Sequence, residues 1–150
     1  MPRMYVLSNT ISSFTAAKTI VELSCATNKL IYIHRIKVSQ STSEADDSTR
    51  LEWGTYTASG TGTPVTANAE AVDPGDSAYA GVAEDNHSVN ISTGEIVKGK
   101  EGISMLAGFE KIFLPRSRLI IPGGLFFGLQ NKIVVTSVDL DYEIEFEEVG

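Results

Sequence analysis

Hydrophobic and acidic residues alternate near the C-terminal end of the chain. Apolar side chains occupy every second position from Val138 to Phe146, and carboxylates occupy the positions between them, from Asp139 to Glu147. A period of two places successive side chains on opposite faces of a β-strand. The pattern therefore predicts a half-buried strand with one apolar face and one acidic face.

The acidic face of this strand has two interpretations. It can face solvent or pair with outward basic residues of a neighbouring strand, such as Arg35, Lys37 or Arg50. Alternatively, it makes a charge contact with another subunit. Neighbouring carboxylates on one strand face lie about 6.5–7 Å apart, too far for two of them to share a calcium ion comfortably. We therefore expect a solvated or paired face without a metal.

Shorter period-two patterns predict further strands. Residues 18–57 contain three: one around Val21 and Leu23, one at 30–39, and one in which Leu51 alternates with charged residues. Weaker patterns follow at 88–91, 95–100, 103–106, 111–114, 118–121 and 124–130. The sequence has no convincing long helix and no internal repeat. Eight or more short strands predict an all-β fold, an antiparallel β-sandwich of jelly-roll type, with a Greek-key barrel as the nearest competitor.

Periodicity disappears between residues 58 and 86. This segment is rich in Gly, Pro and small polar residues and has few large apolar side chains. A connection of this length is far beyond the usual range of about 2–6 residues. Three interpretations stay open: the segment is disordered, it packs on its own subunit, or it is an extended arm that reaches a partner. We expect one domain, residues 1–150, with one long exposed loop or arm at about 58–86.

Composition limits the class of function. The chain has 150 residues with a formal net charge of −7, and its pI is near 4.8. Phosphate backbones and anionic lipids repel such an acidic protein, so nucleic-acid and membrane binding are not expected. No apolar run approaches the roughly 20 residues of a membrane helix. The opening residues lack the zones of a signal peptide, so we expect synthesis in the cytosol.

Single copies of cysteine and tryptophan are expected in the core. Cys25 is the only cysteine, which excludes an internal disulfide and a thiolate metal cluster within the chain. Because Cys25 continues the apolar alternation of Val21 and Leu23, we interpret it as a buried thiol. Trp53 is interpreted as a core anchor, with an exposed ligand platform as the alternative.

Candidate catalytic residues are few. His34 and His87 are the only histidines. His34 shares the parity of apolar neighbours in its strand and is expected to be a satisfied core or sheet-edge residue. His87 is expected in a solvated loop. No Ser or Cys stands in a recognisable nucleophile motif, and the histidines lack ligand spacing with a carboxylate pair. We therefore expect a protein that is not an enzyme and has no metal and no cofactor.

Calcium is the remaining metal to consider, because it prefers six to eight oxygen ligands. Glu44, Asp46 and Asp47 occupy one polar stretch, and Asp73 and Asp76 flank a Pro-Gly turn. Neither group has the alternating acidic positions of an EF-hand loop. Solvated turn chemistry is the expected role of both.

Most of the chain resembles a family of small structural proteins of tailed bacteriophages and prophages that decorate or cement capsids. The resemblance is carried, in chain order, by residues 16–23, 33–42, 45–47, 50–51, 60–64, 75–76, 121–124 and 144–148. The segment 60–64 reads Gly-Thr-Gly-Thr-Pro, and the segment 121–124 reads Ile-Pro-Gly-Gly. Residues 88–116 match least well.

This resemblance implies a virion component without catalytic residues. It would be made in the cytoplasm of the bacterial host and would bind the major capsid protein on the outer shell as a homo-oligomer, with a trimer favoured. We expect its oligomer or capsid contacts in the long loop and in the apolar run after Leu125, whose neighbouring side chains need cover on both strand faces. The contact residues predicted are Thr61, Thr63, Pro64, Val65, Tyr79, Phe126 and Phe127.

A second class of function stays open. The chain could be a receptor- or carbohydrate-binding module of a phage tail or fibre. Such a module would need exposed aromatic side chains over a groove, and Trp53, Tyr56 and Tyr79 are the candidates.

Overall fold

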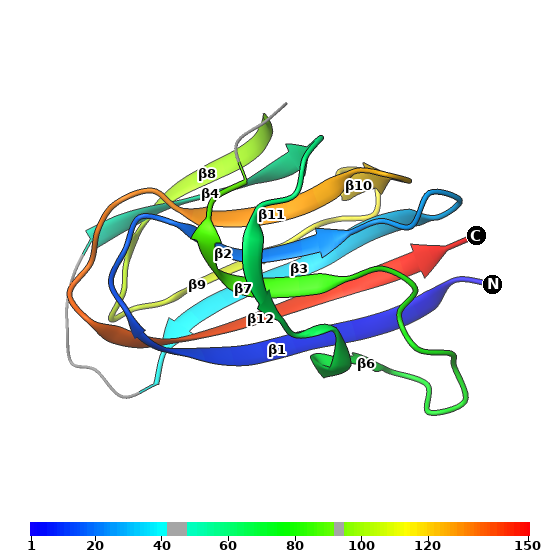
Figure 1. Cartoon of the computed structure of the whole chain (residues 1–150), viewed down its shortest axis with the longest axis horizontal. Helices are drawn as coiled ribbons and strands as arrows, with labels where there is room; N and C mark the ends of the chain where they lie inside the picture. Colours follow the sequence, from blue (N-terminus) through cyan, green and yellow to red (C-terminus); the bar gives the residue numbers. More distant parts are fainter. Residues whose placement is uncertain (42–47, 92–94) are drawn as a thin grey trace.

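The computed structural model of the chain describes residues 1–41, 48–91 and 95–150. Within these ranges, two six-stranded antiparallel sheets lie face to face (Figure 1). The first sheet contains β1 (Arg3–Phe14), β3 (Leu30–Gln40), β6 (Ala69–Ala71), β9 (Phe109–Ile112), β10 (Leu119–Pro122) and β12 (Val138–Val149). The second contains β2 (Thr19–Ser24), β4 (Ser48–Tyr56), β5 (Thr61–Pro64), β7 (Ala83–Val89), β8 (Ile96–Ser104) and β11 (Phe126–Asn131).

The order of the strands is that of a jelly roll. Without β5, β6, β7 and β9, the first sheet runs β10-β3-β12-β1 and the second runs β2-β11-β4-β8. Eight antiparallel strands in two four-stranded sheets form the jelly-roll architecture. The predicted all-β sandwich is therefore confirmed.

The core lies between the two sheets. The inward side chains of β12 are buried from Val138 to Phe146, while the carboxylates between them are half-exposed, as the alternation predicted. Tyr5, Tyr79 and Phe146 form an aromatic cluster with ring centroids 5.0–5.7 Å apart. Among the described residues, no helical segment has the length and apolar character needed to span a membrane.

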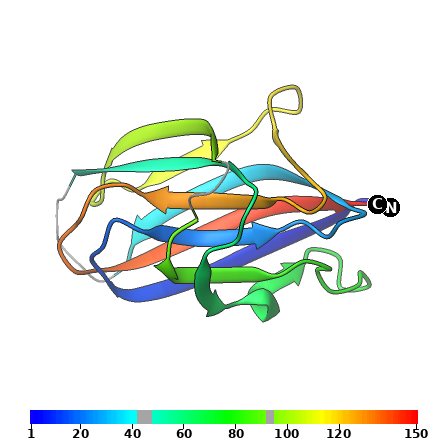
Figure 2. The same ribbon diagram turned by 45° about the horizontal axis from the view of Figure 1, so that its top comes forward.

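The N-terminal strand β1 was not predicted. It pairs with β12 over nearly its whole length, so the two chain ends lie side by side (Figures 1 and 2). Its inward positions include Asn9, which interrupts the apolar alternation of Tyr5, Leu7 and Ile11. The register also shifts after Ile11, where Ser13 has a φ of 55°. These two irregularities hide the strand from a period-two reading.

Strand β8 is longer and more continuous than predicted. The sequence indicated two strands, at 95–100 and 103–106, with a break at Gly102. The structure has one continuous strand that pairs with β4 and shifts register between Trp53 and Gly54. Backbone pairing with β4 therefore continues through Gly102, where Arg50 is its partner.

The segment at 58–86 packs on its own subunit. It forms β5, the single 3₁₀ turn η1 (Thr66–Asn68), β6 and the start of β7. Strand β6 extends the first sheet beside β1, whereas β7 and β5 extend the second sheet beside β2. The expectation of one long exposed loop or arm is thus corrected: backbone pairing and burial of Val65, Tyr79 and Ala83 fix the segment to both sheets.

The insertion makes the two long sides of the sandwich different. On one side, called the insertion side, β5, β6, β7 and η1 cover the strands β1 and β2. On the opposite side, called the open side, β8 forms the edge of one sheet and β9 and β10 lie at the edge of the other (Figure 2).

Candidate functional site

The predicted contact residues are divided between surface and core. Thr61, Thr63 and Pro64 are exposed on β5, and Phe126 is half-buried. Val65 and Tyr79 are only 7% and 6% exposed, and Phe127 is fully buried. The prediction that these last three contact a partner is therefore wrong for this fold, because their side chains fill the space between the sheets.

An open groove follows the open side of the sandwich. Its apolar lining comes from Trp53 on β4, Phe109 and Phe113 in and after β9, and Ile120 on β10. The ring centroids of Trp53 and Phe109 lie 5.4 Å apart, and the two rings bridge the two sheets. Because Trp53 is 4% exposed, it is a core anchor as predicted, and only its edge reaches this groove. We call these residues and their basic neighbours the edge groove.

Basic side chains surround the edge groove in an otherwise acidic protein. Its lining includes Lys98, Lys100, Lys111 and Arg118, with Glu101 as a carboxylate among them. The guanidinium of Arg118 lies over the ring of Tyr32 at 4.3 Å, and the ammonium of Lys111 lies 5.8 Å from the ring centroid of Phe113. These side chains combine an apolar floor with positive charge.

Apolar side chains also stand out from the strands beside the edge groove. They are Ile96, Val97, Ile112, Leu114 and Ile120, which are 43–69% exposed. Single exposed apolar residues are common on any protein, and Val72 and Val82 are examples on the insertion side. On the open side, Ile120 lines the groove itself, and the other four residues lie on or just after the strands that border it.

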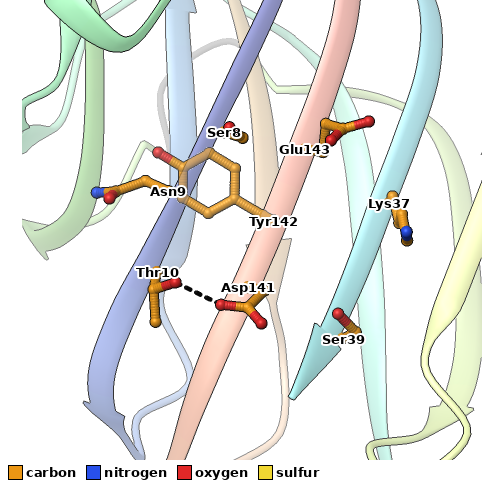
Figure 3. Close-up of a pocket in the computed structure, with 8 residues that line it drawn as sticks. All are labelled: Ser8, Asn9, Thr10, Lys37, Ser39, Asp141, Tyr142 and Glu143. Atoms are coloured by element: carbon orange, nitrogen blue, oxygen red, sulfur yellow. Dashed lines mark hydrogen bonds between the residues drawn. The ribbon is translucent and has the colours of Figure 1, made fainter. Parts of the chain in front are cut away.

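The outer face of the first sheet carries the acidic ladder of β12. Arg35 on β3 pairs with Glu143, with Glu145 at 3.1 Å and with Glu110 at 3.2 Å. This bears out the predicted pairing with a neighbouring strand. A shallow depression beside these pairs has polar lining, in which Thr10 donates a hydrogen bond to Asp141 (Figure 3). Its lining residues are Ser8, Asn9, Thr10, Lys37, Ser39, Asp141, Tyr142 and Glu143.

His34 has a partner, as predicted, but it is neither a core nor a sheet-edge residue: the register shift between β3 and β12 beside it leaves its ring on the outer face. Its ring lies on β3, and Nε2 is 3.1 Å from Oε2 of Glu147 on the adjacent strand. Arg118 also approaches Glu147, at 3.6 Å. The imidazole is therefore a satisfied sheet residue that is about one quarter exposed.

His87 does not lie in a solvated loop, so that prediction is wrong. It belongs to β7 and its side chain is fully buried. Its neighbour Asn86 has a φ of 47°, and the pairing between β5 and β7 shifts register there. This irregularity turns His87 to the face that carries Glu84 and Glu22, whereas Asp85 points to the core. Sequence alternation alone could not show this.

Glu22, Glu84 and His87 form a group that we call the β2–β7 cluster. Oε2 of Glu22 lies 3.0 Å from Nε2 of His87, and Oε2 of Glu84 lies 3.9 Å from the same nitrogen. Burial would raise the pKa of Glu22. Hydrogen bonds from His87, the Ser59 hydroxyl and the Gly60 N–H outweigh burial and hold that pKa below its ordinary value. The Glu22 carboxylate is therefore ionised at neutral pH.

The chain between β4 and β5 crosses directly over the β2–β7 cluster. A Cβ atom at Gly60 would lie 2.7 Å from Cδ2 of His87, and one at Gly62 would lie 2.8 Å from its Cε1 and Nδ1. Only glycine allows the backbone to approach the ring so closely at both positions. The Gly-Thr-Gly segment therefore covers the cluster.

A second buried polar group joins the two sheets. Asp85 on β7 accepts hydrogen bonds from Asn9 at 2.7 Å and from the Tyr142 hydroxyl at 2.8 Å. Burial and the Asp85 carboxylate raise the pKa of Tyr142. Since Asn9 and Tyr142 of the first sheet both donate to Asp85 of the second, this group fixes how the insertion side of one sheet lies on the other.

Cys25 is buried, as predicted. Burial, together with the charge of Glu148, raises the pKa of its thiol to about 11. Glu148 itself continues the inward parity of β12 and is 2% exposed. Neither of its carboxylate oxygens has a hydrogen-bond partner in the described part of the chain. The ladder pattern ends one residue before this inward carboxylate, so the sequence reading missed it.

Two acidic groups were considered for calcium, and one of them lies within the described residues. Glu44, Asp46 and Asp47 lie outside the described residues. Asp73 accepts a hydrogen bond from the Gly75 N–H at 2.9 Å, and Asp76 lies 3.9 Å from Arg3. The second group therefore acts within its own turn and toward β1.

The aromatic residues proposed for a carbohydrate platform are buried. Trp53, Tyr56 and Tyr79 are 4%, 0% and 6% exposed. Burial also raises the pKa of Tyr56 and Tyr79. An exposed platform built on these three side chains is therefore excluded, because they pack in the interior.

Comparisons with known proteins give little further information. No protein-family model and no curated protein matches the chain. A mutant VP2 protein of infectious bursal disease virus in derived T=1 particles shows a TM-score of 0.22 and 11% identity, covering 99% of this chain and 40% of VP2. The VP2 subviral particle of the same virus gives a TM-score of 0.18 and 13% identity, covering 99% and 41%. The chain thus spans less than half the length of these VP2 chains.

Proposed function

We propose that this protein is a non-enzymatic virion component of a tailed bacteriophage or prophage that decorates the capsid. In this proposal it binds the major capsid protein on the outer shell and stabilises the particle. The sequence resemblance to decoration and cement proteins supports this class. Jelly rolls also occur in capsid and lectin domains, so the fold is compatible with presenting a binding surface.

The observation that carries the proposal is the edge groove. Its aromatic and aliphatic lining remains open, and the 47% exposed side chain of Ile120 is part of that lining. Grouped exposed apolar surface can mark a protein–protein contact. The lysines around the groove favour a partner segment that carries carboxylates beside its apolar residues.

Oligomerisation is part of the same proposal. Two edges, β8 and β10, border the open side, and exposed strand edges are normally paired or covered. A homo-oligomer on the capsid, with a trimer favoured by the resemblance, would cover part of this side. Capsid binding would cover the remainder.

Binding to purified capsids that lack the protein tests the proposal. The variant Lys98→Glu with Lys111→Glu reverses two charges on the groove without altering the core. We expect wild type to bind in a defined number of copies per capsid and the variant to bind at least tenfold more weakly. Lys29→Glu with Lys37→Glu, the same charge change on other surfaces, is the matched control. Equal binding by wild type and the groove variant would contradict the groove as the contact.

A receptor- or glycan-binding module remains the rival. After burial of its three predicted aromatic residues, it would have to use Phe109 and Phe113 in the same groove. A glycan array distinguishes the two classes: specific glycan binding without capsid binding would replace the proposed function.

A further inference from the structure

We propose that the β2–β7 cluster is a binding site for a divalent transition-metal ion, with Zn²⁺ as the reference case. The ligands would be one carboxylate oxygen each from Glu22 and Glu84 and Nε2 of His87. The sequence predicted no metal because the histidines lack ligand spacing with a nearby carboxylate pair. Glu22 lies 65 residues from His87 and meets it only in the fold. The proposal does not depend on the proposed function.

The distances fit a small tetrahedral ion. The candidate ligand atoms of Glu22, Glu84 and His87 all lie within 4.8 Å of one another. Bonds of about 2.0–2.1 Å in tetrahedral geometry place neighbouring ligands roughly 3.4 Å apart. The two distances to Nε2, 3.0 and 3.9 Å, bracket this separation. Three protein ligands would leave one position for water.

Hydrogen bonding leaves the cluster incomplete without a cation. A proton on Nε2 of His87 can bond well to Glu22 but not to Glu84 at 3.9 Å. Nδ1 of the same ring is buried and has no hydrogen-bond partner among the described residues. Within the described ranges, Nδ1 stays without a partner in either state, because a metal on Nε2 leaves the ring proton on Nδ1. The difference lies at Nε2, where a proton reaches one carboxylate and a metal would engage both at once.

Charge gives an independent argument. In the described part of the chain, no Lys or Arg forms an ion pair with Glu22 or Glu84. Two carboxylates beside a buried ring are costly unless a cation compensates them. A divalent ion balances their charge of −2.

The position of the cluster is suited to holding an ion. The side chains of His87 and Glu22 are 0% and 4% exposed, whereas that of Glu84 is 25% exposed and supplies a path from solvent. Hydrogen bonds from Ser59 and Gly60 orient Glu22, and the Gly62 N–H orients Glu84 at 3.2 Å. Such supporting bonds are a regular feature of metal ligands.

The test uses the full chain stripped of metal with EDTA. Titration with Co²⁺ should give visible d–d absorption that saturates at one ion per chain and is displaced by Zn²⁺. Zn²⁺ at 100-fold above its dissociation constant should raise the melting temperature by roughly 5 °C or more. Absence of both signals for wild type would overturn the proposal.

Variants assign the signal to its ligands. Glu84→Gln keeps an oxygen that can accept from Gly62 and should fold. It should weaken Co²⁺ binding by more than about 100-fold, the upper end of what losing a supporting bond costs. His87→Gln should do the same, and if it fails to fold, Glu84→Gln decides alone. His34→Gln is the matched control, because His34 also faces a carboxylate, Glu147, at 3.1 Å. Wild-type binding by Glu84→Gln, or loss of binding in His34→Gln, would show that the ion binds elsewhere.

Discussion

The two long sides of the sandwich are built from the same kind of strands, but an insertion covers one side and leaves the other open. On the insertion side, η1 and the strands β5, β6 and β7 cover β1 and β2. The buried group around Asp85 joins the two sheets, and the group around His87 and Glu22 fixes the chain before β5 to the second sheet. On the open side, Trp53 and Phe109 meet at a groove that no further segment of the described chain covers.

This difference assigns folding stability mainly to the insertion side and contact with a partner mainly to the open side. A side with buried hydrogen-bonded carboxylates depends on each partner, because an unpaired buried polar group costs about 1–3 kcal/mol. A side with exposed apolar residues loses little when one is replaced. We therefore expect changes on the insertion side to affect folding and changes on the open side to affect binding.

The largest expected effect follows deletion of the insertion. Removing residues 61–79 would take Val65, Ala69 and Tyr79 from the core and would uncover His87. We expect the shortened protein to be unfolded already at room temperature, so that circular dichroism would show no cooperative transition on heating. A chain that lacks only the exposed Pro74 and Gly75 should melt like wild type. A deletion variant that keeps its transition would contradict this role of the insertion.

A single aromatic residue on each side gives a smaller and directly matched comparison. Tyr79→Ala removes a ring packed against Tyr5 and Phe146 and a hydrogen bond to the Ser24 carbonyl, so it should cost about 3–5 kcal/mol. Phe113→Ala truncates a half-exposed ring and should cost less than about 2 kcal/mol. Urea denaturation measures both. Equal losses would mean that the open side is as tightly packed as the insertion side.

The sequence predicted strands well where alternation is long and regular. The ten-residue pattern from Val138 to Glu147 indicated both the strand and the face that Arg35 pairs with. The shorter alternations around Val21 and Leu51 likewise indicated that Cys25 and Trp53 are buried, since each shares the parity of apolar neighbours. In these places local pattern and tertiary burial agree.

Prediction failed on the insertion side for physical reasons. Strands β5 and β6 have only four and three residues, too few for a period to be recognised. Their pairing partners are distant in sequence, and Asn86 reverses the expected direction of His87 by its positive φ. The β2–β7 cluster depends on all three facts, so the chain could not reveal it.

Replacing Glu22 tests the insertion side through pH. Since the pKa of Glu22 is lowered in the folded state, its contribution to stability is present above the ordinary value of 4.5 and is lost as the pH falls through the folded-state value. In metal-free buffer at pH 7, Glu22→Gln should be less stable by about 1–3 kcal/mol. Melting curves should converge toward wild type as the pH falls below 4.5. A constant difference across this range would show that the Glu22 charge contributes nothing.

The smallest effect on folding is expected on the open side, where binding should change instead. Ile112→Ser with Leu114→Ser replaces two side chains that are 60% and 69% exposed, so the free energy of unfolding should change by no more than about 0.5 kcal/mol per site. Val72→Ser with Val82→Ser, at 60% and 50% exposure on the insertion side, is the control. The oligomer fraction measured by sedimentation and the amount bound to capsids should fall for the first pair. Both should stay at the wild-type level for the second pair. If both pairs behave alike, exposure without the neighbouring groove determines association, and the contrast between the two sides has no functional meaning.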